Sequence, residues 1–117
     1  MAEVRWSDHA MERLREQVRF IAEQSQSKEI AWKWANAVFD EVDALADFPN
    51  IGHRLPEFPS LPYREILARK QFRVIYRIED GVCNIITIRR AAMLLDEDTI
   101  AELDDVKTTF DPKTDTK

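Results

Sequence analysis

The feature that most constrains the fold of this 117-residue chain is an alternating segment divided by a two-residue turn. Residues 72–79, FRVIYRIE, carry an apolar side chain at every second position, and residues 82–89, VCNIITIR, are rich in β-branched residues. The dipeptide Asp80-Gly81 between them is typical of the tight turn that joins two antiparallel strands. The sequence therefore predicts a β-hairpin at the centre of the fold.

A third strand is expected over residues 64–69, joined to the hairpin by a second two-residue turn at Lys70-Gln71. Cross-strand partners lie on the same face of a sheet, so the two turns together assign the faces. This register pairs Arg64 with Arg77, Ile75 with Ile86, and Arg73 with Ile88. One face then carries Arg64, Arg73, Arg77, Asn84 and Arg90 around Ile66, Ile75, Ile86 and Ile88. The opposite face carries Leu67, Phe72, Val74, Tyr76, Ile78, Cys83, Ile85 and Thr87.

The arginine-rich face has two interpretations. Arginines on an antiparallel sheet often only solvate it, with their stems covering apolar neighbours. Alternatively, a guest that is anionic and partly apolar, such as an acidic peptide or a phosphate backbone, binds there. The acidic C-terminal segment is a further possible cover for this face.

Two helices and a short strand precede the meander. Residues 3–6 are expected to form the strand, and Ser7 or Asp8 to cap a first helix with an apolar stripe at spacings of three and four. Ser27 is expected to cap a second helix that ends near Phe48, because Pro49 disfavours a helical residue before it. Such a pair forms an antiparallel helix hairpin.

The remaining segments complete an α+β fold of order β-α-α-β-β-β, with the helix hairpin packed on one face of a small, mainly antiparallel sheet. Residues 49–62 contain four prolines and are expected to form a loop, which apolar side chains attach to the body: Ile51, Leu55 and Phe58. We expect one folded domain over residues 1–95. An acidic segment follows over residues 96–117, with a short helix near residues 98–106 and a frayed tail.

Charge is segregated along the chain. The whole chain carries a net charge of −5, but residues 64–90 contain seven basic and three acidic residues, a local charge of +4. No apolar run approaches the ~20 residues that span a bilayer, and the N-terminus lacks a signal-peptide core, so a cytoplasmic protein is expected. Cys83 is expected to be a small core residue, and His9 and His53 to be solvated surface residues. We expect no metal and no cofactor.

Three segments occur in a characteristic order after the helix hairpin: PNIGHRLPE, LPYREI and FRVIYRIEDGVCNIITIRR. In this order and spacing, residues 3–91 resemble the RelE/ParE superfamily of bacterial toxins. The resemblance implies the toxin of a type II toxin–antitoxin, or plasmid stabilisation, module. Its partner would be an antitoxin whose disordered acidic or amphipathic tail folds onto it, as a helix in a groove or an added strand, giving a hetero-oligomer.

The two branches of the superfamily differ in their targets. RelE-like toxins are ribosome-dependent mRNA endoribonucleases, and in that branch Arg73 and, more loosely, Lys70 match the expected basic residues. The sequence departs from this pattern, because no histidine or tyrosine follows Tyr76 and acidic residues follow the last strand. Glu65, the residue one might offer as a general base, is expected on the core side in a salt bridge.

ParE-like toxins inhibit DNA gyrase through protein contacts, without a catalytic residue set, and Arg89 and Arg90 match the basic end of their last strand. We therefore favour a ParE-like, non-enzymatic toxin. A RelE-like ribonuclease and a non-toxic antitoxin-binding relative remain the alternatives. The residues expected to bind the antitoxin or the target are Arg64, Arg73, Ile75, Arg77, Ile86, Ile88, Arg89 and Arg90.

Overall fold

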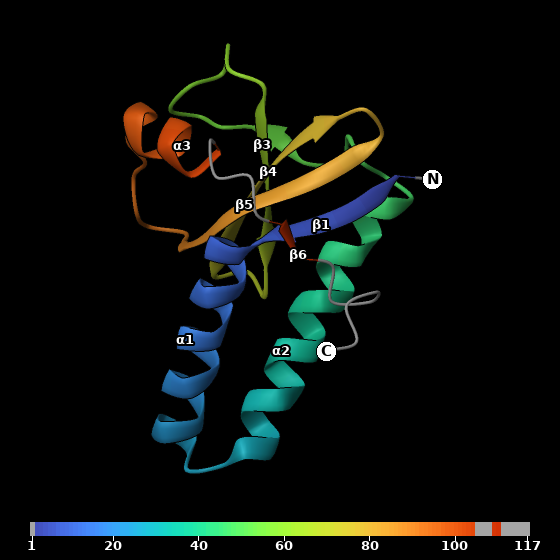
Figure 1. Cartoon of the computed structure of the whole chain (residues 1–117). Coiled ribbons are helices and arrows are strands. Elements are labelled where there is room, and N and C mark those ends of the chain that lie inside the picture. The colour runs from blue at the N-terminus through green and yellow to red at the C-terminus, as the bar shows by residue number, and fades with distance from the viewer. Residues whose placement is uncertain (1, 105–108, 111–117) are drawn as a thin grey trace.

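The computed structural model describes residues 2–104 and 109–110. The elements are β1 (Glu3–Ser7), α1 (Asp8–Ser25), α2 (Lys28–Asp43), the 3-10 turn η1 (Ala44–Ala46), β2 (His53–Arg54), β3 (Tyr63–Ala68), β4 (Phe72–Glu79), β5 (Val82–Arg90), α3 (Glu97–Asp104) and β6 (Thr109–Phe110). They form one sheet of order β2-β3-β4-β5-β1-β6, in which β1 runs parallel to β5 and the other pairs are antiparallel (Figure 1). The predicted α+β fold is confirmed.

Both helices of the hairpin begin at the predicted serines. The Ser7 hydroxyl accepts a hydrogen bond from the backbone N–H of Ala10, and the Ser27 hydroxyl accepts one from Ile30, at 3.0 and 3.1 Å. These bonds satisfy backbone donors that the first turn of a helix leaves free. The end of the second helix was expected near Phe48. It lies earlier, at Asp43, because the chain tightens into η1 before reaching Pro49.

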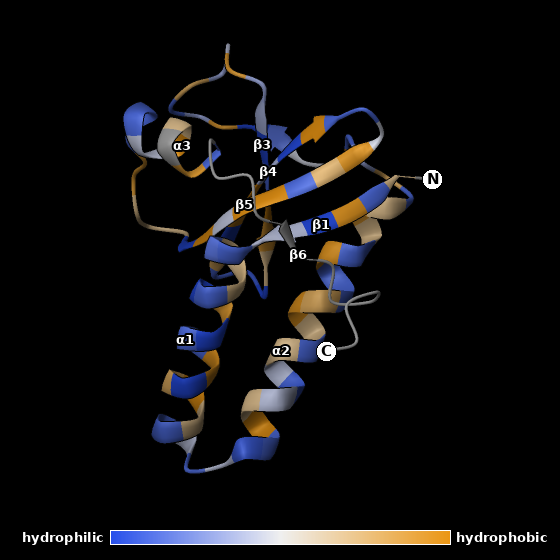
Figure 2. Cartoon of the chain, in the orientation of Figure 1, coloured by the Kyte–Doolittle hydropathy of each residue, from blue (hydrophilic) through white to orange (hydrophobic). Residues whose placement is uncertain are grey.

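The hairpin packs its base against one face of the sheet, and its loop end extends away from the sheet (Figure 1). Apolar residues of α1 and α2 lie on the sides where the two helices face each other (Figure 2). The core between hairpin and sheet is built from Trp6, Ala10, Met11, Leu14, Val38, Val42, Leu45, Ala68, Phe72, Val74, Tyr76, Cys83, Ile85 and Ile88. Cys83 is buried there, as predicted.

The turn between β3 and β4 has three residues rather than the two expected. Arg69 and Lys70 both adopt positive φ angles, 52° and 62°, and the Arg69 N–H donates to the Glu41 carboxylate of α2 at 3.0 Å. The strands therefore pair with a register one residue away from the prediction, so that Arg64 lies opposite Tyr76 and not opposite Arg77. A slip of one residue moves every side chain of a strand to the other face. Accordingly, Ile66 packs with the hairpin core while Leu67 is exposed on the other side.

The Asp80-Gly81 turn forms as predicted, with positive φ at both residues and Glu79 opposite Val82. The predicted pairing holds as far as Tyr76 opposite Ile85. A β-bulge then shifts the register, so that Ile75 pairs with Thr87.

The bulge overturns two expected pairs and one expected face, because it inserts one extra residue into β5. The predicted pairs of Ile75 with Ile86 and of Arg73 with Ile88 are wrong, and Arg73 lies opposite Arg89. Ile88 belongs to the hairpin core rather than to the arginine-rich face.

The sheet face opposite the hairpin is covered by a second core. Leu55 from the proline-rich loop and Leu95 and Ile100 from the C-terminal segment pack with Tyr63, Ile75 and Ile86. Figure 1 shows α3 beside the sheet, away from the hairpin. An open arginine-rich face around exposed isoleucines is therefore wrong, and the alternative, a cover by the C-terminal segment, is what the structure shows up to Asp104. The predicted helix near residues 98–106 forms at Glu97–Asp104. Of the expected frayed tail, Phe110 pairs with Trp6 in β6, and the rest lies outside the described residues.

The proline-rich loop is attached by Leu55 and Phe58 as predicted, whereas Ile51 is exposed. Its first half is fixed by Tyr76, whose hydroxyl donates to the Pro49 carbonyl at 2.8 Å and accepts from the Gly52 N–H at 3.0 Å. A Cβ at Gly52 would lie 2.5 Å from that hydroxyl. This close approach requires glycine and holds the loop against β3 and β4.

Candidate functional site

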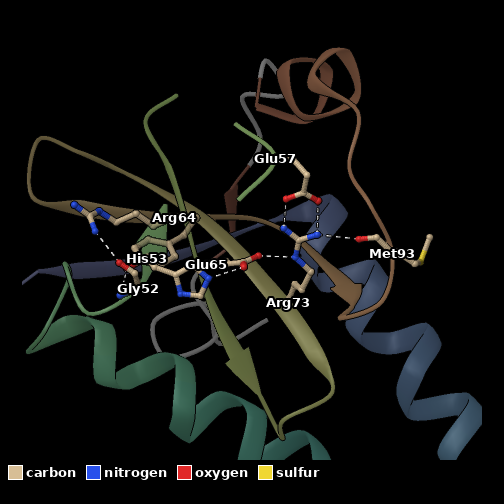
Figure 3. Close-up of polar contacts among 8 residues, drawn as sticks. Gly52, His53, Glu57, Arg64, Glu65, Arg73 and Met93 are labelled. Atoms are coloured by element: carbon tan, nitrogen blue, oxygen red, sulfur yellow. Dashed lines mark hydrogen bonds and ion pairs between the residues drawn. The ribbon is translucent and has the colours of Figure 1, made fainter. Parts of the chain in front are cut away.

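Arg73, the arginine at the start of β4, is buried with only 4% of its surface exposed. Figure 3 shows its guanidinium between two carboxylates. The Nη1 and Nη2 groups donate to Glu57 in a bidentate pair, both at 2.7 Å, and Nε donates to Glu65. Nη1 also donates to the Met93 carbonyl at 2.8 Å. Four of the five N–H donors of the guanidinium are therefore used inside the protein.

The electrostatics of this cluster follow from its geometry. Hydrogen bonding by Arg73 lowers the pKa of Glu57 to about 2, against the opposing effect of burial. The Glu57 hydrogen bonds in turn raise the pKa of Arg73 above its ordinary value. Two carboxylates surround one guanidinium, so the cluster has no positive charge left to offer a ligand.

Glu65 is also bonded to His53, whose Nε2 lies 2.7 Å from Glu65 Oε2. His53 is exposed, as predicted, and Glu65 forms the salt bridge that was expected of it, but on the face opposite the hairpin core. A cavity of about 460 Å³ lies beside these side chains and is lined by His53, Pro56, Glu57, Glu65, Leu67, Arg73, Ala91 and Leu94.

This cluster does not supply the chemistry of RNA cleavage in the observed geometry. A carboxylate with a pKa near 2 is a weak general base. The donors of Arg73 point at Glu57 and Glu65 instead of toward an open phosphate position. Lys70, the other residue that matches the RelE-like pattern, lies in the exposed β3–β4 turn.

Arg77 is neutralised in a similar way by α3. Its Nε lies 2.8 Å from Asp104 Oδ2, and its Nη1 lies 3.2 Å from Glu79 Oε1. Burial opposes the charged form, but these two carboxylates outweigh it and raise the pKa of Arg77. Asp104 also accepts a hydrogen bond from the Tyr63 hydroxyl at 2.9 Å. One residue of α3 thus binds two positions of the sheet.

The other predicted binding residues are dispersed by the fold. Arg64 donates to the Gly52 carbonyl at 2.7 Å and so supports the proline-rich loop. Ile75 and Ile86 are buried under α3, and Ile88 is buried against the hairpin. Arg89 and Arg90 lie together at the end of β5 beside α1, and neither forms an ion pair among the described residues. Of the expected set, Arg64, Arg89 and Arg90 have no carboxylate partner in the described part of the chain, and Arg64 donates to backbone carbonyls instead.

A groove between α1 and α2 is the second candidate surface, and sequence reasoning missed it. It encloses about 420 Å³ and is lined by Met11, Leu14, Arg15, Val18, Arg19, Trp32, Ala35 and Phe39. Trp32 is 61% exposed there. The sequence signal for this groove is Trp32, a large aromatic residue outside the apolar stripe of the second helix.

The element order, with a helix hairpin on one face of an antiparallel meander extended by a parallel first strand, defines the fold of a RelE/ParE-type toxin. The family model described as the ParE toxin of the type II toxin–antitoxin system parDE matches residues 4–95, and the chain belongs to this family. It is a type II toxin–antitoxin toxin of the ParE type.

A solved structure described as a chromosomal ParDE TA system from P. aeruginosa is similar in fold. Its sequence identity is 21% and its TM-score 0.65, and the match covers 77% of this chain and 96% of that chain. No curated protein sequence matches the chain. Among the helices of the described residues, none is long and apolar enough to cross a membrane.

We predict that the Glu57–Arg73 pair makes stability depend on acid pH. Because the pKa of Glu57 is depressed to about 2 in the folded state, from an ordinary value of 4.5, its contribution is complete above pH 4.5 and is lost as the pH falls toward 2. The free energy of unfolding of the wild type should fall by about 3 kcal/mol more over this range than that of Glu57→Gln. Urea unfolding at a series of pH values measures this difference.

The matched control is Glu23→Gln, at an exposed position of α1. This variant should follow the pH dependence of the wild type. Parallel pH profiles for the wild type and Glu57→Gln would contradict the assigned ion pair.

Proposed function

We propose that this protein is the toxin of a plasmid-stabilising or chromosomal module, that a cognate antitoxin neutralises it in the cytoplasm as a hetero-oligomer, and that it acts by binding DNA gyrase. The observation that carries the proposal is the ParE family match over residues 4–95. The similar structure belongs to a ParDE system, which supports a partner protein for this chain as well.

The geometry of the Arg73 cluster supports a protein target over messenger RNA. The guanidinium that a ribonuclease would offer to a phosphate is bound by Glu57 and Glu65. The net charge of −5 opposes association with a polyanion. A ParE-like toxin that acts through protein contacts requires neither a free guanidinium there nor a general base.

The groove between α1 and α2 is the proposed docking position of the antitoxin. An amphipathic helix places its apolar side into such a groove, and the exposed Trp32 supplies a large aromatic anchor. Arg15 and Arg19 border the groove and pair with Glu12 at 3.5 and 3.3 Å. Exposed ion pairs of this kind contribute little stability, so the two arginines can release Glu12 and pair with acidic residues of an antitoxin instead.

The proposed target is tested with purified protein in two parallel assays. In a supercoiling assay, the protein should inhibit DNA gyrase, and adding the cognate antitoxin should restore supercoiling. On translating ribosomes it should leave messenger RNA intact. Cleaved message with unaffected supercoiling would assign the RelE-like activity. The absence of both effects, with normal growth of an expressing bacterial host, would indicate a non-toxic relative.

The docking position is tested by Trp32→Glu, which should weaken antitoxin binding by at least about 30-fold, the loss typical of a buried aromatic anchor. Isothermal titration calorimetry with the cognate antitoxin measures the affinity. The matched control is Phe48→Glu, an aromatic residue with the same 61% exposure that does not line the groove. Equal affinities for the two variants would exclude this groove as the docking position.

A further inference from the structure

A small cleft lies where the end of β5 passes beside α1. Figure 1 shows the C-terminal end of β5 reaching the first turns of α1. The cleft encloses about 180 Å³ and is lined by Arg13, Glu16, Gln17, Phe20, Phe72, Ile88, Arg89, Arg90 and Met93. We call it the arginine cleft after Arg13, Arg89 and Arg90.

The positive charge of the arginine cleft is not balanced by acids among the described residues. Arg89 Nε is buried and has no hydrogen-bond partner among the described residues. Arg90 lies over the ring of Phe20, at 6.0 Å from its centroid, and has no carboxylate partner in that part of the chain. Arg13 pairs with Glu16 at 3.3 Å, where both side chains are exposed. The cleft lining therefore contains three guanidinium groups and one carboxylate, that of Glu16, which is exposed to solvent.

The pKa of His9 is affected by the same positive charge. Its ring Nε2 lies 3.1 Å from the Thr87 hydroxyl, so it lies beside β5 two residues before Arg89. Burial lowers the pKa of His9, and Arg89 and Arg13 lower it further, with only Glu16 acting in the opposite direction. Burial and then Arg13 also lower the pKa of Arg89. The guanidinium groups of Arg13 and Arg89 thus act on both His9 and each other, and among the described acids only Glu16 opposes their effect on His9.

The contrast with β4 shows that this imbalance is local. Arg73 has two carboxylate partners, and Arg77 lies within ion-pair distance of Asp104 and Glu79. The fold places acids in ion-pair contact with both of these arginines, whereas Arg89 and Arg90 have no such contact among the described residues. A buried, unpaired N–H donor is unfavourable unless a ligand accepts from it.

We propose that the arginine cleft binds a carboxylate side chain of an acidic and apolar peptide segment from a partner protein. The cleft volume suits one side chain, and Phe20, Ile88 and Met93 offer apolar walls to its neighbours. A single carboxylate feels mainly the nearby guanidinium groups, whereas a nucleic acid also meets the repulsion of the −5 net charge. The identification of this partner as the antitoxin rests on the proposed function. The proposal that the cleft binds a carboxylate is independent of it.

The cleft and the helix groove lie on two sides of the same helix. Residues 11, 14, 15 and 18 of α1 line the groove, and residues 13, 16, 17 and 20 line the cleft. A partner segment that leaves the groove and passes around α1 therefore reaches the arginine cleft. One partner segment can therefore contact both the groove and the arginine cleft.

The test is an NMR titration of the full-length protein with a capped peptide of alternating leucine and glutamate, and with its glutamine analogue. The glutamate peptide should raise the pKa of His9, because a bound anion favours the charged imidazolium, and should shift the Arg89 Nε–H resonance. The other histidine of the chain, His53, is the internal control and should not respond. The glutamine analogue should have neither effect.

Variants and an oligonucleotide complete the test. Arg13→Gln and Arg89→Gln should each reduce affinity for the glutamate peptide about tenfold, the loss expected for a charge-assisted hydrogen bond. Arg5→Gln, an exposed arginine on β1 with an ion-pair partner in Glu3, should not. An unchanged His9 pKa at saturating peptide, or equal affinity for Arg89→Gln, would overturn the proposal. Tighter binding of a single-stranded oligonucleotide of equal charge would also overturn it. The experiment involves no gyrase and no toxicity, so its failure is separate from failure of the proposed function.

Discussion

The buried guanidinium of Arg73 connects most parts of this fold. It joins β4 to Glu65 of β3, to Glu57 of the proline-rich loop and to the Met93 carbonyl beyond β5. Glu57 in turn accepts from the Leu95 N–H. A buried charge is tolerated when it is paired and hydrogen-bonded, and removing one partner typically costs 3–5 kcal/mol. This cluster therefore determines where the loop and the C-terminal segment lie on the sheet.

The closed outer face changes where a partner can bind. Once Glu57 and Met93 hold the loop and the C-terminal segment, Ile100 fills the space over Ile75 and Ile86, and Asp104 neutralises Arg77. The sheet then offers few free cations. Exposed apolar and cationic groups remain on the helix hairpin and at the end of β5, where the groove and the arginine cleft lie. A chain with a basic sheet can thus cover most of that charge and leave exposed apolar and cationic surfaces elsewhere.

Local signals in the sequence predicted local structure. Ser7 and Ser27 begin the helices and Asp80-Gly81 forms the hairpin turn, since each acts through bonds to near neighbours. The faces of the sheet were not predictable in this way. One extra residue in the β3–β4 turn and one in the bulge of β5 reversed the assignment of Arg64 and Ile88. The turn is held by a tertiary contact, that of Arg69 with Glu41 of α2. The partner of Arg73 also comes from a distant loop. The sequence signal for this partner was Glu57, a lone glutamate in the otherwise apolar run LPEFP at residues 55–59.

The closure of the outer sheet face is measured most directly by hydrogen exchange at the arginine side chains. In ¹⁵N-labelled protein, the Nε–H of Arg73 should exchange far more slowly than those of Arg90 and Arg13, because it is buried and donates to Glu65. It should remain slow when the antitoxin is bound, since the partner is expected on the hairpin and at the end of β5. Rapid exchange of the Arg73 Nε–H in the free protein would show that this face is open. Loss of its protection when the antitoxin binds would show that the face opens to receive the partner.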